Sequence, residues 1–399
     1  MVRILFTYEV MEPSVGLSLP FFERLSQKYN IEVRKKSVRD VTNKDIEWCD
    51  IIYCIRGQSY ISSEILRLGK VTNRLIVCMY DDDFLSLQDF VARRKLQVKA
   101  IRKNIHYSDA LFSGNDTLAM RLKEINKQMS YVRIDTPVKE EEINIKRNFR
   151  AKSVLKVVYY ASDGTVNAFD KIIRNAIMEL DHDTRQCIDW TFIVVKPDLK
   201  DLVDDNLVHY IPRMSLLEFK KYLFEGDFDV GIAPLVEGDF TSCKYINKYI
   251  EYTLAGIPCI FSKVEPYESF VKHGIDGLLC ENTPKAWIDA LNKMRNEKFR
   301  KECVINAQHR LLEDFGLDKL IERTIQKYPL LVTYQAPHGI RVKGVTKVKV
   351  MNKMLIAFDY IGRASVRIRK DGITSLIKLV WGHYILGKDY NEIFKKHNR

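Results

Sequence analysis

The chain has 399 residues, of which 46% are hydrophobic. That is enough for two α/β domains with buried cores, and it excludes an intrinsically disordered protein. The net charge is +12, but residues 331–399 hold 14 Lys or Arg against four Asp or Glu, so residues 1–330 carry only +2. The chain therefore divides into a nearly neutral body and a basic appendage.

No apolar run reaches the roughly 18 residues that a membrane-spanning helix needs. No signal-like segment precedes the first apolar run, so we expect a cytoplasmic protein. The eight cysteines include no CxxC pair, and most lie in apolar runs. We therefore expect buried, reduced thiols.

Strand and helix signals alternate through residues 1–145, which predicts a Rossmann-like domain with a mostly parallel sheet. The predicted strands are VRILFTY, IEVRKKS, DIIYCI, RLIVCMY, ALFSG and YVRI. The polar segment 139–152 then indicates a domain boundary.

The same plan restarts in residues 146–302, the second predicted domain. Its predicted strands are SVLKVVYYA, WTFIVVK, LVHYI, FDVGIAPL, AGIPCIFS and GLLC. Two doubly wound sheets of this kind place their ligand sites at the carboxyl ends of the strands.

Residues 228–281 carry the most informative pattern. A strand ends at Leu235, a polar loop follows with Thr241 and Ser242, and a helix is predicted from about Lys244 to Leu254. A loop that leads into a helix start presents free backbone amides and suits a phosphate group.

Lys244, Lys248 and Glu251 have the spacing i, i+4 and i+7, which predicts one shared helix face. The two ammonium groups suit a diphosphate, and the carboxylate suits the two hydroxyls of a ribose. A ladder of Lys and Glu on a solvated helix explains the same spacing, so both interpretations remain open at this point.

The segment resembles the C-terminal domain of family-4-like glycosyltransferases of the GT-B fold, as in bacterial capsule and O-antigen synthesis. Ten residues stand in register with the pattern of that family: Asp229, Gly231, Pro234, Leu235, Lys244, Lys248, Glu251, Tyr252, Gly256 and Pro258. Two positions depart from it. Tyr245 replaces a usual Ser, and Cys243 stands eight residues before Glu251, where the pair of glutamates typical of the family is incomplete.

The resemblance implies two Rossmann-like domains that face a cleft and a helix over 303–330 that crosses back to the first domain. It implies a hexosyltransferase that uses a nucleotide-sugar, retains anomeric configuration and needs no bound metal or other cofactor. It also implies that Glu251 contacts the donor ribose, while Lys244, Lys248 and the loop amides contact the diphosphate.

Further donor contacts are expected at turns after predicted strands. Ser162 and Gly164 lie in the first such turn of the second domain, where the resemblance places donor phosphates, although a plain tight turn explains them equally well. Arg213 ends the segment 209–213, which resembles the segment that packs on the nucleobase, and it could reach the diphosphate; a surface role remains open for it. Gly16 lies in the first predicted strand-to-helix loop.

Asp81, Asp82 and Asp83 follow a predicted buried strand. Carboxylates at the carboxyl end of such a strand face the ligand side of the sheet, so one of them is a candidate general base for the acceptor hydroxyl. Capping of the next helix is the alternative.

The appendage 331–399 combines basic with aromatic residues, and residues 340–350 alternate apolar and basic, which predicts an exposed strand. We expect this appendage to dock on an anionic membrane surface near a glycan or lipid-linked acceptor, while packing back on the body remains open. Nucleic acid is not an expected partner. A GT-B-fold sugar-nucleotide epimerase and a catalytically silent scaffold subunit are the rival functions.

Overall fold

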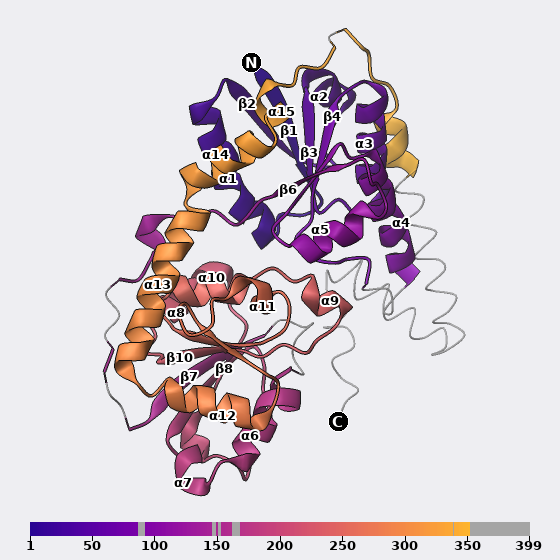
Figure 1. Cartoon of the computed structure of the whole chain (residues 1–399). Coiled ribbons are helices and arrows are strands. Elements are labelled where there is room, and N and C mark those ends of the chain that lie inside the picture. The colour runs from indigo at the N-terminus through magenta and orange to yellow at the C-terminus, as the bar shows by residue number, and fades with distance from the viewer. Residues whose placement is uncertain (87–91, 146–148, 151–152, 162–167, 338, 352–399) are drawn as a thin grey trace, which may run out of the picture.

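The computed structural model describes the chain except for residues 87–91, 146–148, 151–152, 162–167, 338 and 352–399. Two α/β halves lie one above the other in Figure 1, and a parallel sheet of six strands forms the centre of each described half. The predicted pair of doubly wound domains is therefore confirmed.

The sheet of the first half has the order β2-β1-β3-β4-β5-β6, with parallel neighbours throughout. Its strands are β1 (Val2–Tyr8), β2 (Ile31–Ser37), β3 (Ile51–Ile55), β4 (Leu75–Met79), β5 (Ala110–Ser113) and β6 (Ser130–Arg133). Its helices are α1 (Pro13–Lys28), α2 (Asn43–Trp48), α3 (Tyr60–Val71), α4 (Ala92–Tyr107) and α5 (Asp116–Lys123), and η1 (Glu140–Glu142) follows.

Helices cover both faces of this sheet because its strands are apolar on both sides. In β1, Ile4 and Phe6 pack in the same cluster as Phe22 of α1. Leu5, between them, packs on the opposite face with Ile65 of α3. This two-sided burial explains the nearly continuous apolar runs in the sequence.

The sheet of the second half has the order β12-β11-β10-β7-β8-β9 and is also parallel. Its strands are β7 (Leu155–Tyr160), β8 (Ile188–Ile193), β9 (Val208–Ile211), β10 (Val230–Ala233), β11 (Cys259–Ser262) and β12 (Leu278–Cys280). Its helical segments are η2 (Phe169–Ile173), α6 (Arg174–Glu179), α7 (His182–Arg185), η3 (Asp205–Leu207), α8 (Leu216–Glu225), α9 (Asp239–Ser242), α10 (Asn247–Leu254), α11 (Tyr267–Phe270) and α12 (Pro284–Lys293). Trp190 and Trp287 are buried at the centre of its core.

Two helices connect the second half back to the first, and Figure 1 shows them along one side of the molecule. Helix α13 (Glu297–Phe315) packs on the second half through Leu311, and α14 (Leu317–Lys327) packs on the first half through Leu320 and Ile321. Gly316 separates the two helices. A short helix, α15 (Leu330–Thr333), follows.

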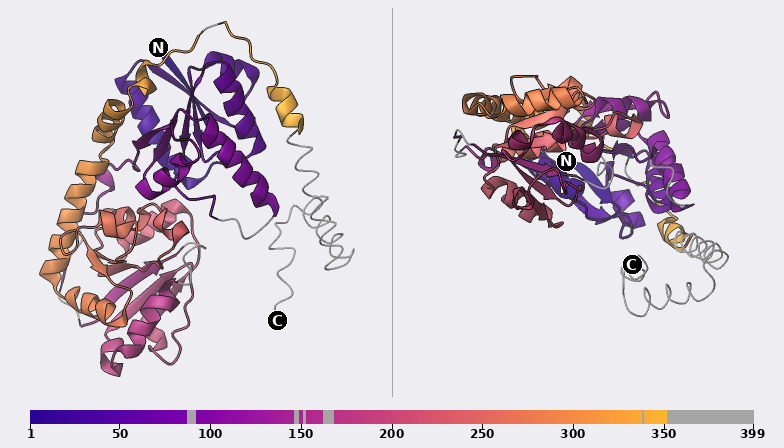
Figure 2. Two further views of the ribbon diagram at one scale, coloured as in Figure 1. Left: turned by 45° about the vertical axis from the view of Figure 1, so that its right-hand side comes forward. Right: turned by 90° about the horizontal axis from the view of Figure 1, so that it is seen from below.

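The described start of the basic appendage is part of the first half. Val342, Val345 and Val348 are buried in the same cluster as Leu5. The backbone N–H of Ala336 donates to Asp50 at 2.9 Å. Figure 2 shows this last helical segment beside the first half.

The prediction of an exposed strand over residues 340–350 was therefore wrong. Residues 345–351 are helical, and Val345 and Val348, three residues apart in this helix, are both buried; Val342 is buried in the segment just before it. The alternation of valine with lysine suggested a period of two, but burial against the first half selects the period of a helix.

The expectation for the cysteines is confirmed: all eight are free thiols, and seven of them are buried. Among the described residues, no helix has both the length and the apolar character to cross a membrane.

Candidate functional site

A cavity of about 200 Å³ lies between the two halves, at the carboxyl ends of strands from both sheets. The first half contributes Ser14 and Leu17 of α1, together with Arg56 and Asp81. The second half contributes Glu251 of α10. The predicted donor residue and a member of the predicted acidic cluster thus line one cavity, although they are far apart in sequence.

Glu251 lies on α10, which ends where Gly256 adopts a φ of +73°. A left-handed residue after the last turn is the usual way to end a helix, and glycine accepts that conformation without strain. The Glu251 carboxylate accepts a hydrogen bond from the hydroxyl of Tyr160, at the end of β7. Burial raises the pKa of Glu251 to about 7, against the opposing effects of the Tyr160 hydroxyl, Lys220 and Lys248.

Lys248 lies one turn before Glu251, between two aromatic rings. Its Nζ is 4.5 Å from the ring centre of Tyr159 and 5.0 Å from that of Tyr160. Burial lowers the pKa of Lys248 to about 7. An anion that reached Nζ would reverse this effect, because an opposite charge favours the protonated amine.

The helix that carries these residues begins at Asn247 and not near Lys244 as the sequence predicted. Lys244 precedes the helix, so only Lys248 and Glu251 share its face. The Lys244 Nζ lies 4.6 Å from the ring centre of Phe240. A short helix, α9, lies within the predicted polar loop, and the chain turns again after it, so the predicted helix begins three residues later than expected.

The hydroxyls of the predicted phosphate loop bind within the loop. Thr241 Oγ1 donates to the carbonyl of Val236 at 2.7 Å, and Ser242 Oγ donates to that of Asp239 at 3.0 Å. These bonds fix the shape of the loop, so any contact of the two hydroxyls with a ligand requires them to exchange partners.

The three aspartates of the acidic cluster have different surroundings. Asp81 is paired with the guanidinium of Arg56 through Nε and, at 2.6 Å, through Nη2. Asp83 has no exposed surface, accepts from the amides of Leu85 and Ser86, and is paired with Arg121. Asp83 thus caps the turn over residues 84–86, whereas the rest of the helix predicted there lies outside the described residues, and of the three aspartates Asp81 lines the cavity.

Asp82 is paired more weakly with arginine than Asp81 and Asp83 are. Its carboxylate is 3.5 Å from Arg56 and keeps 32% of its surface exposed. Burial, followed by the charge of Asp81, raises the pKa of Asp82 to about 6, and Lys244 in the other half opposes that shift. A carboxyl group with a pKa near neutrality suits proton transfer.

Arg56 is a site residue that the sequence analysis missed. It follows β3 directly, has a φ of 48°, and also pairs with Glu12 at 2.8 Å. Its place at the carboxyl end of a predicted strand was the available signal, because residues at such positions face the ligand side of the sheet.

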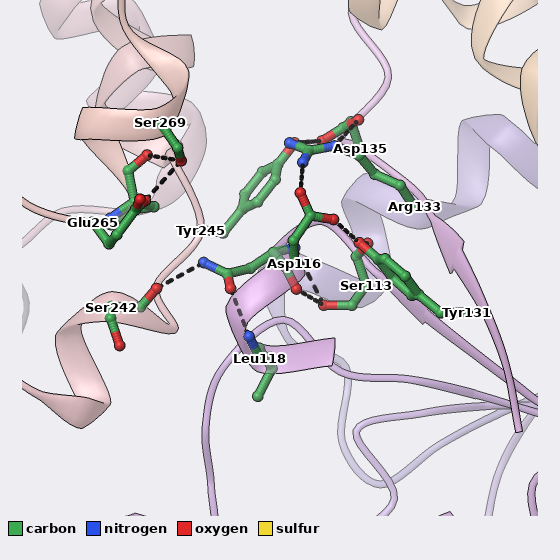
Figure 3. Close-up of polar contacts among 12 residues, drawn as sticks. Ser113, Asp116, Leu118, Tyr131, Arg133, Asp135, Ser242, Tyr245, Glu265 and Ser269 are labelled. Carbon is green, nitrogen blue, oxygen red and sulfur yellow. Dashed lines mark hydrogen bonds and ion pairs between the residues drawn. The ribbon is translucent and has the colours of Figure 1, made fainter. Parts of the chain in front are cut away.

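A second missed feature holds the phosphate loop against the first half, as Figure 3 shows. Asn115 Nδ2 donates to the carbonyls of Ser242 at 3.0 Å and of Lys244 at 2.8 Å. Tyr245, which departs from the family pattern, accepts from the backbone N–H of Thr136 at 2.8 Å. No sequence signal pairs residues more than 100 positions apart.

The four remaining predicted donor contacts are Gly16, Arg213, Ser162 and Gly164. Gly16 lies within the first turns of α1 and not in the preceding loop, and a Cβ at this position would meet open space. Arg213 is exposed in the segment after β9. Ser162 and Gly164 lie outside the described residues.

The geometry defines a molecule of two facing α/β halves with a polar site between them, which is the GT-B architecture. Several solved glycosyltransferases share this fold. HepE from Anabaena, solved with UDP-glucose, is 12% identical with a TM-score of 0.56 and matches 82% of this chain and 100% of its own. Sucrose-phosphate synthase from Thermosynechococcus elongatus is 10% identical with a TM-score of 0.56, and the match covers 83% of this chain and 99% of that one.

The lipopolysaccharide outer core galactosyltransferase WaaB is 11% identical with a TM-score of 0.51, and the match covers 82% of this chain and 99% of that one. No protein-family model and no curated protein sequence matches the chain. Similarity at this level of identity demonstrates the fold, and the activity has to be argued from the site.

Proposed function

We propose that the protein is a glycosyltransferase that takes a sugar from a nucleotide-sugar bound mainly to the second half and transfers it to an acceptor bound mainly to the first. The observation that carries the proposal is the shared cavity, where Glu251 from the second half and Asp81 with Arg56 from the first half line one space. Titratable groups from two domains that meet at the carboxyl ends of strands are typical of a two-substrate site. HepE, which shares the fold, was solved with UDP-glucose.

In this proposal the donor is held along α10 and the loop before it. Glu251 accepts the ribose hydroxyls in place of the Tyr160 hydroxyl, and Lys248 with Lys244 neutralises the diphosphate. The lowered pKa of Lys248 supports this role, because an incoming phosphate would stabilise the charged form of this buried amine. Amides of the loop with Thr241 and Ser242 would complete the phosphate site.

Four more donor contacts belong to the same proposal on the basis of the family resemblance. Ser162 and Gly164 would approach the phosphates, Arg213 would reach the diphosphate, and Gly16 would let backbone approach the substrates. No bound metal or other cofactor is part of the proposed reaction.

The proposed transfer forms a bond between an acceptor oxygen and the anomeric carbon of the sugar and breaks the bond from that carbon to the diphosphate. The acceptor proton passes either to Asp82 or to the leaving diphosphate, which Lys244 and Lys248 stabilise. Retention of configuration and a hexose as the transferred sugar are proposed from the family resemblance.

The acceptor proposed is a glycan or a lipid-linked saccharide of cell-surface polysaccharide synthesis, such as a capsule or an O-antigen. WaaB, a lipopolysaccharide galactosyltransferase, shares the fold and supports this class. The basic residues of 331–399 suit an anionic membrane surface at the inner face of the cell membrane. Nucleic acid is not a proposed partner.

The test is a thermal-shift screen of the wild type and Glu251→Ala with UDP, GDP, ADP, CMP and their sugar conjugates. A ligand that binds only the folded state raises the melting temperature. The proposal expects one nucleotide class to raise that temperature in the wild type and to have no effect on Glu251→Ala. A wild type that responds to none of them contradicts the proposal.

One observation favours a second candidate, a catalytically silent scaffold of the same fold. Cys243 stands where the first glutamate of the family pair is expected, and it is fully buried in the core of the first half. Turnover separates the candidates. Acceptor-dependent release of nucleotide identifies a transferase, an isomerised donor identifies an epimerase, and binding without either identifies a scaffold.

A further inference from the structure

The loop before α10 belongs to the second half by sequence but packs as part of the first half. Cys243 is fully buried in a hydrophobic cluster whose other members come from the first half, including Leu118 and Leu122 of α5. Arg121 of the same helix pairs with Asp239 at 3.0 Å. The loop that bears the proposed phosphate contacts is therefore anchored at its start and its middle to the acceptor half.

Asn115 provides a second anchor through both the oxygen and the nitrogen of its side-chain amide. Its Oδ1 accepts from Leu118 N at 2.7 Å and caps α5, so the orientation of the side chain is fixed within the first half. Its Nδ2 then donates to the carbonyls of Ser242 and Lys244. The backbone on each side of Cys243 is thus held by one rigid side chain.

Tyr245 forms the third anchor, where the family pattern has a serine. Its hydroxyl accepts from Thr136 N at 2.8 Å and donates to Asp135 at 3.3 Å. Its ring lies against Gly114, where a Cβ would come within 2.4 Å of the ring. A serine at position 245 would reach none of these partners, and any side chain at position 114 would displace the ring.

We propose that Asn115 and Tyr245 are positioning residues of the donor site, which hold Lys244 and the phosphate loop in the binding conformation from the opposite half. Donor affinity then depends on the contact between the halves, and Asn115 of the first half contributes to nucleotide binding without touching the nucleotide. This inference rests on the proposed function, since it assigns the loop to the donor phosphates.

The variants are Asn115→Asp, Tyr245→Phe and Gly114→Ala. Asn115→Asp keeps an oxygen that can cap α5 but replaces the donor to Ser242 and Lys244 by an acceptor. Gly114→Ala displaces the Tyr245 ring through a change made entirely in the first half. The matched controls are Asn296→Asp, which changes the capping residue of α13, and Tyr334→Phe, whose hydroxyl bonds Asn73 within the first half.

The first measurement is the dissociation constant for UDP, or for the nucleoside diphosphate with the largest thermal shift, well below the melting temperature. Loss of two hydrogen bonds that order a binding loop should weaken binding roughly tenfold in Asn115→Asp. The controls should bind as the wild type does. A purely structural role would lower the melting temperature and leave this affinity unchanged, and that result would overturn the inference.

The second measurement asks whether Asn115 acts through Lys244. In a Lys244→Ala background, Asn115→Asp should change the affinity by less than about twofold, because contacting residues are not additive. The same roughly tenfold loss in both backgrounds would show that Asn115 acts by another route.

Amide hydrogen exchange of residues 238–246 without nucleotide tests the anchors independently of any ligand. Faster exchange in the three variants than in the controls is expected, and unchanged exchange would overturn the anchoring. A wild type that binds no nucleotide, with exchange faster in the variants, would instead contradict the proposed function and leave the anchors as a contact between halves.

Discussion

The hydroxyl of Tyr160 donates a hydrogen bond to the carboxylate of Glu251, from the end of β7 to the middle of α10. The bond ties the first strand of the second half to the helix that faces the cavity. A ribose hydroxyl that bound the same carboxylate oxygen of Glu251 would have to replace Tyr160. Without a ligand, the Tyr160 hydroxyl therefore provides a hydrogen bond to this buried carboxylate. Several expected outcomes depend on this arrangement.

Glu251→Gln should stabilise the protein at pH 8 and not at pH 4.5. Burial raises the pKa of Glu251 from 4.5 to about 7, so the folded state binds the proton more tightly than the unfolded state does. Stability from this group is therefore lost as the pH rises from 4.5 to 7, by about 1–3 kcal/mol. Melting temperatures at the two pH values measure the effect. The exposed Glu302→Gln should be neutral at both, and an equal gain of Glu251→Gln at both would refute the explanation.

Lys248→Met should raise the melting temperature below pH 7 and abolish any shift caused by nucleotide. Burial lowers the pKa of Lys248 from 10.5 to about 7, so the folded state carries the full cost of a buried ammonium below pH 7. The cost disappears as the pH rises towards 10.5, and the gain of the variant should shrink with it. Methionine keeps contact with the Tyr159 ring. Lys285→Met, at an exposed position of α12, is the control, and destabilisation by Lys248→Met at pH 6 would contradict the prediction.

Asp82→Asn and Asp83→Asn should fail in different ways. Asp82 is partly exposed and only loosely paired, so its amide variant should fold normally and lose turnover by roughly 100-fold if Asp82 transfers the proton. Asp83 is buried against Arg121, so its amide variant should lose about 3 kcal/mol of folding free energy. Urea unfolding with steady-state rates separates the two. A stable, fully active Asp82→Asn would assign the proton to the leaving diphosphate.

Truncation of the basic appendage should have two separable effects. A chain that ends at residue 351 keeps Val342, Val345 and Val348 in the core of the first half, whereas a chain that ends at Pro329 exposes the surface they cover. We expect the shorter chain to lose several kcal/mol of stability and the longer one to melt near the wild type. Co-sedimentation with vesicles containing anionic lipid should fall in the chain ending at 351. Unchanged co-sedimentation would refute the proposed membrane contact.

The strands were predictable because their cause is local. Each central strand is an apolar run buried on both faces, and β3 (Ile51–Ile55) is buried throughout. The shared helix face of Lys248 and Glu251 followed from their spacing. The start of α10 was not predictable, because Cys243 and Tyr245 pack against the first half, and no local pattern encodes contacts of that kind.

Other parts of the site depend on contacts that no local pattern encodes. Asn115 and Ser242 are 127 residues apart, and their bond exists only because the two halves meet there. The difference between Asp82 and Asp83 also arises from tertiary contacts. Asp83 is paired with Arg121 and Asp82 lies near Arg56, and neither contact can be read from two adjacent aspartates in the sequence.

The chain passes between the halves at residues near Val138 and again at Gly316. These two passages are joined to each other, because Val138 pairs with Gly316 and its N–H donates to the carbonyl of Phe315 at 2.9 Å. Two adjoining crossings form the natural place for a hinge between the halves, because a relative rotation displaces the backbone least where the chain itself passes between them. A separation of the halves about such a hinge requires the contacts of the anchored loop with the first half to break, so these contacts would limit the entry of substrates and the release of products.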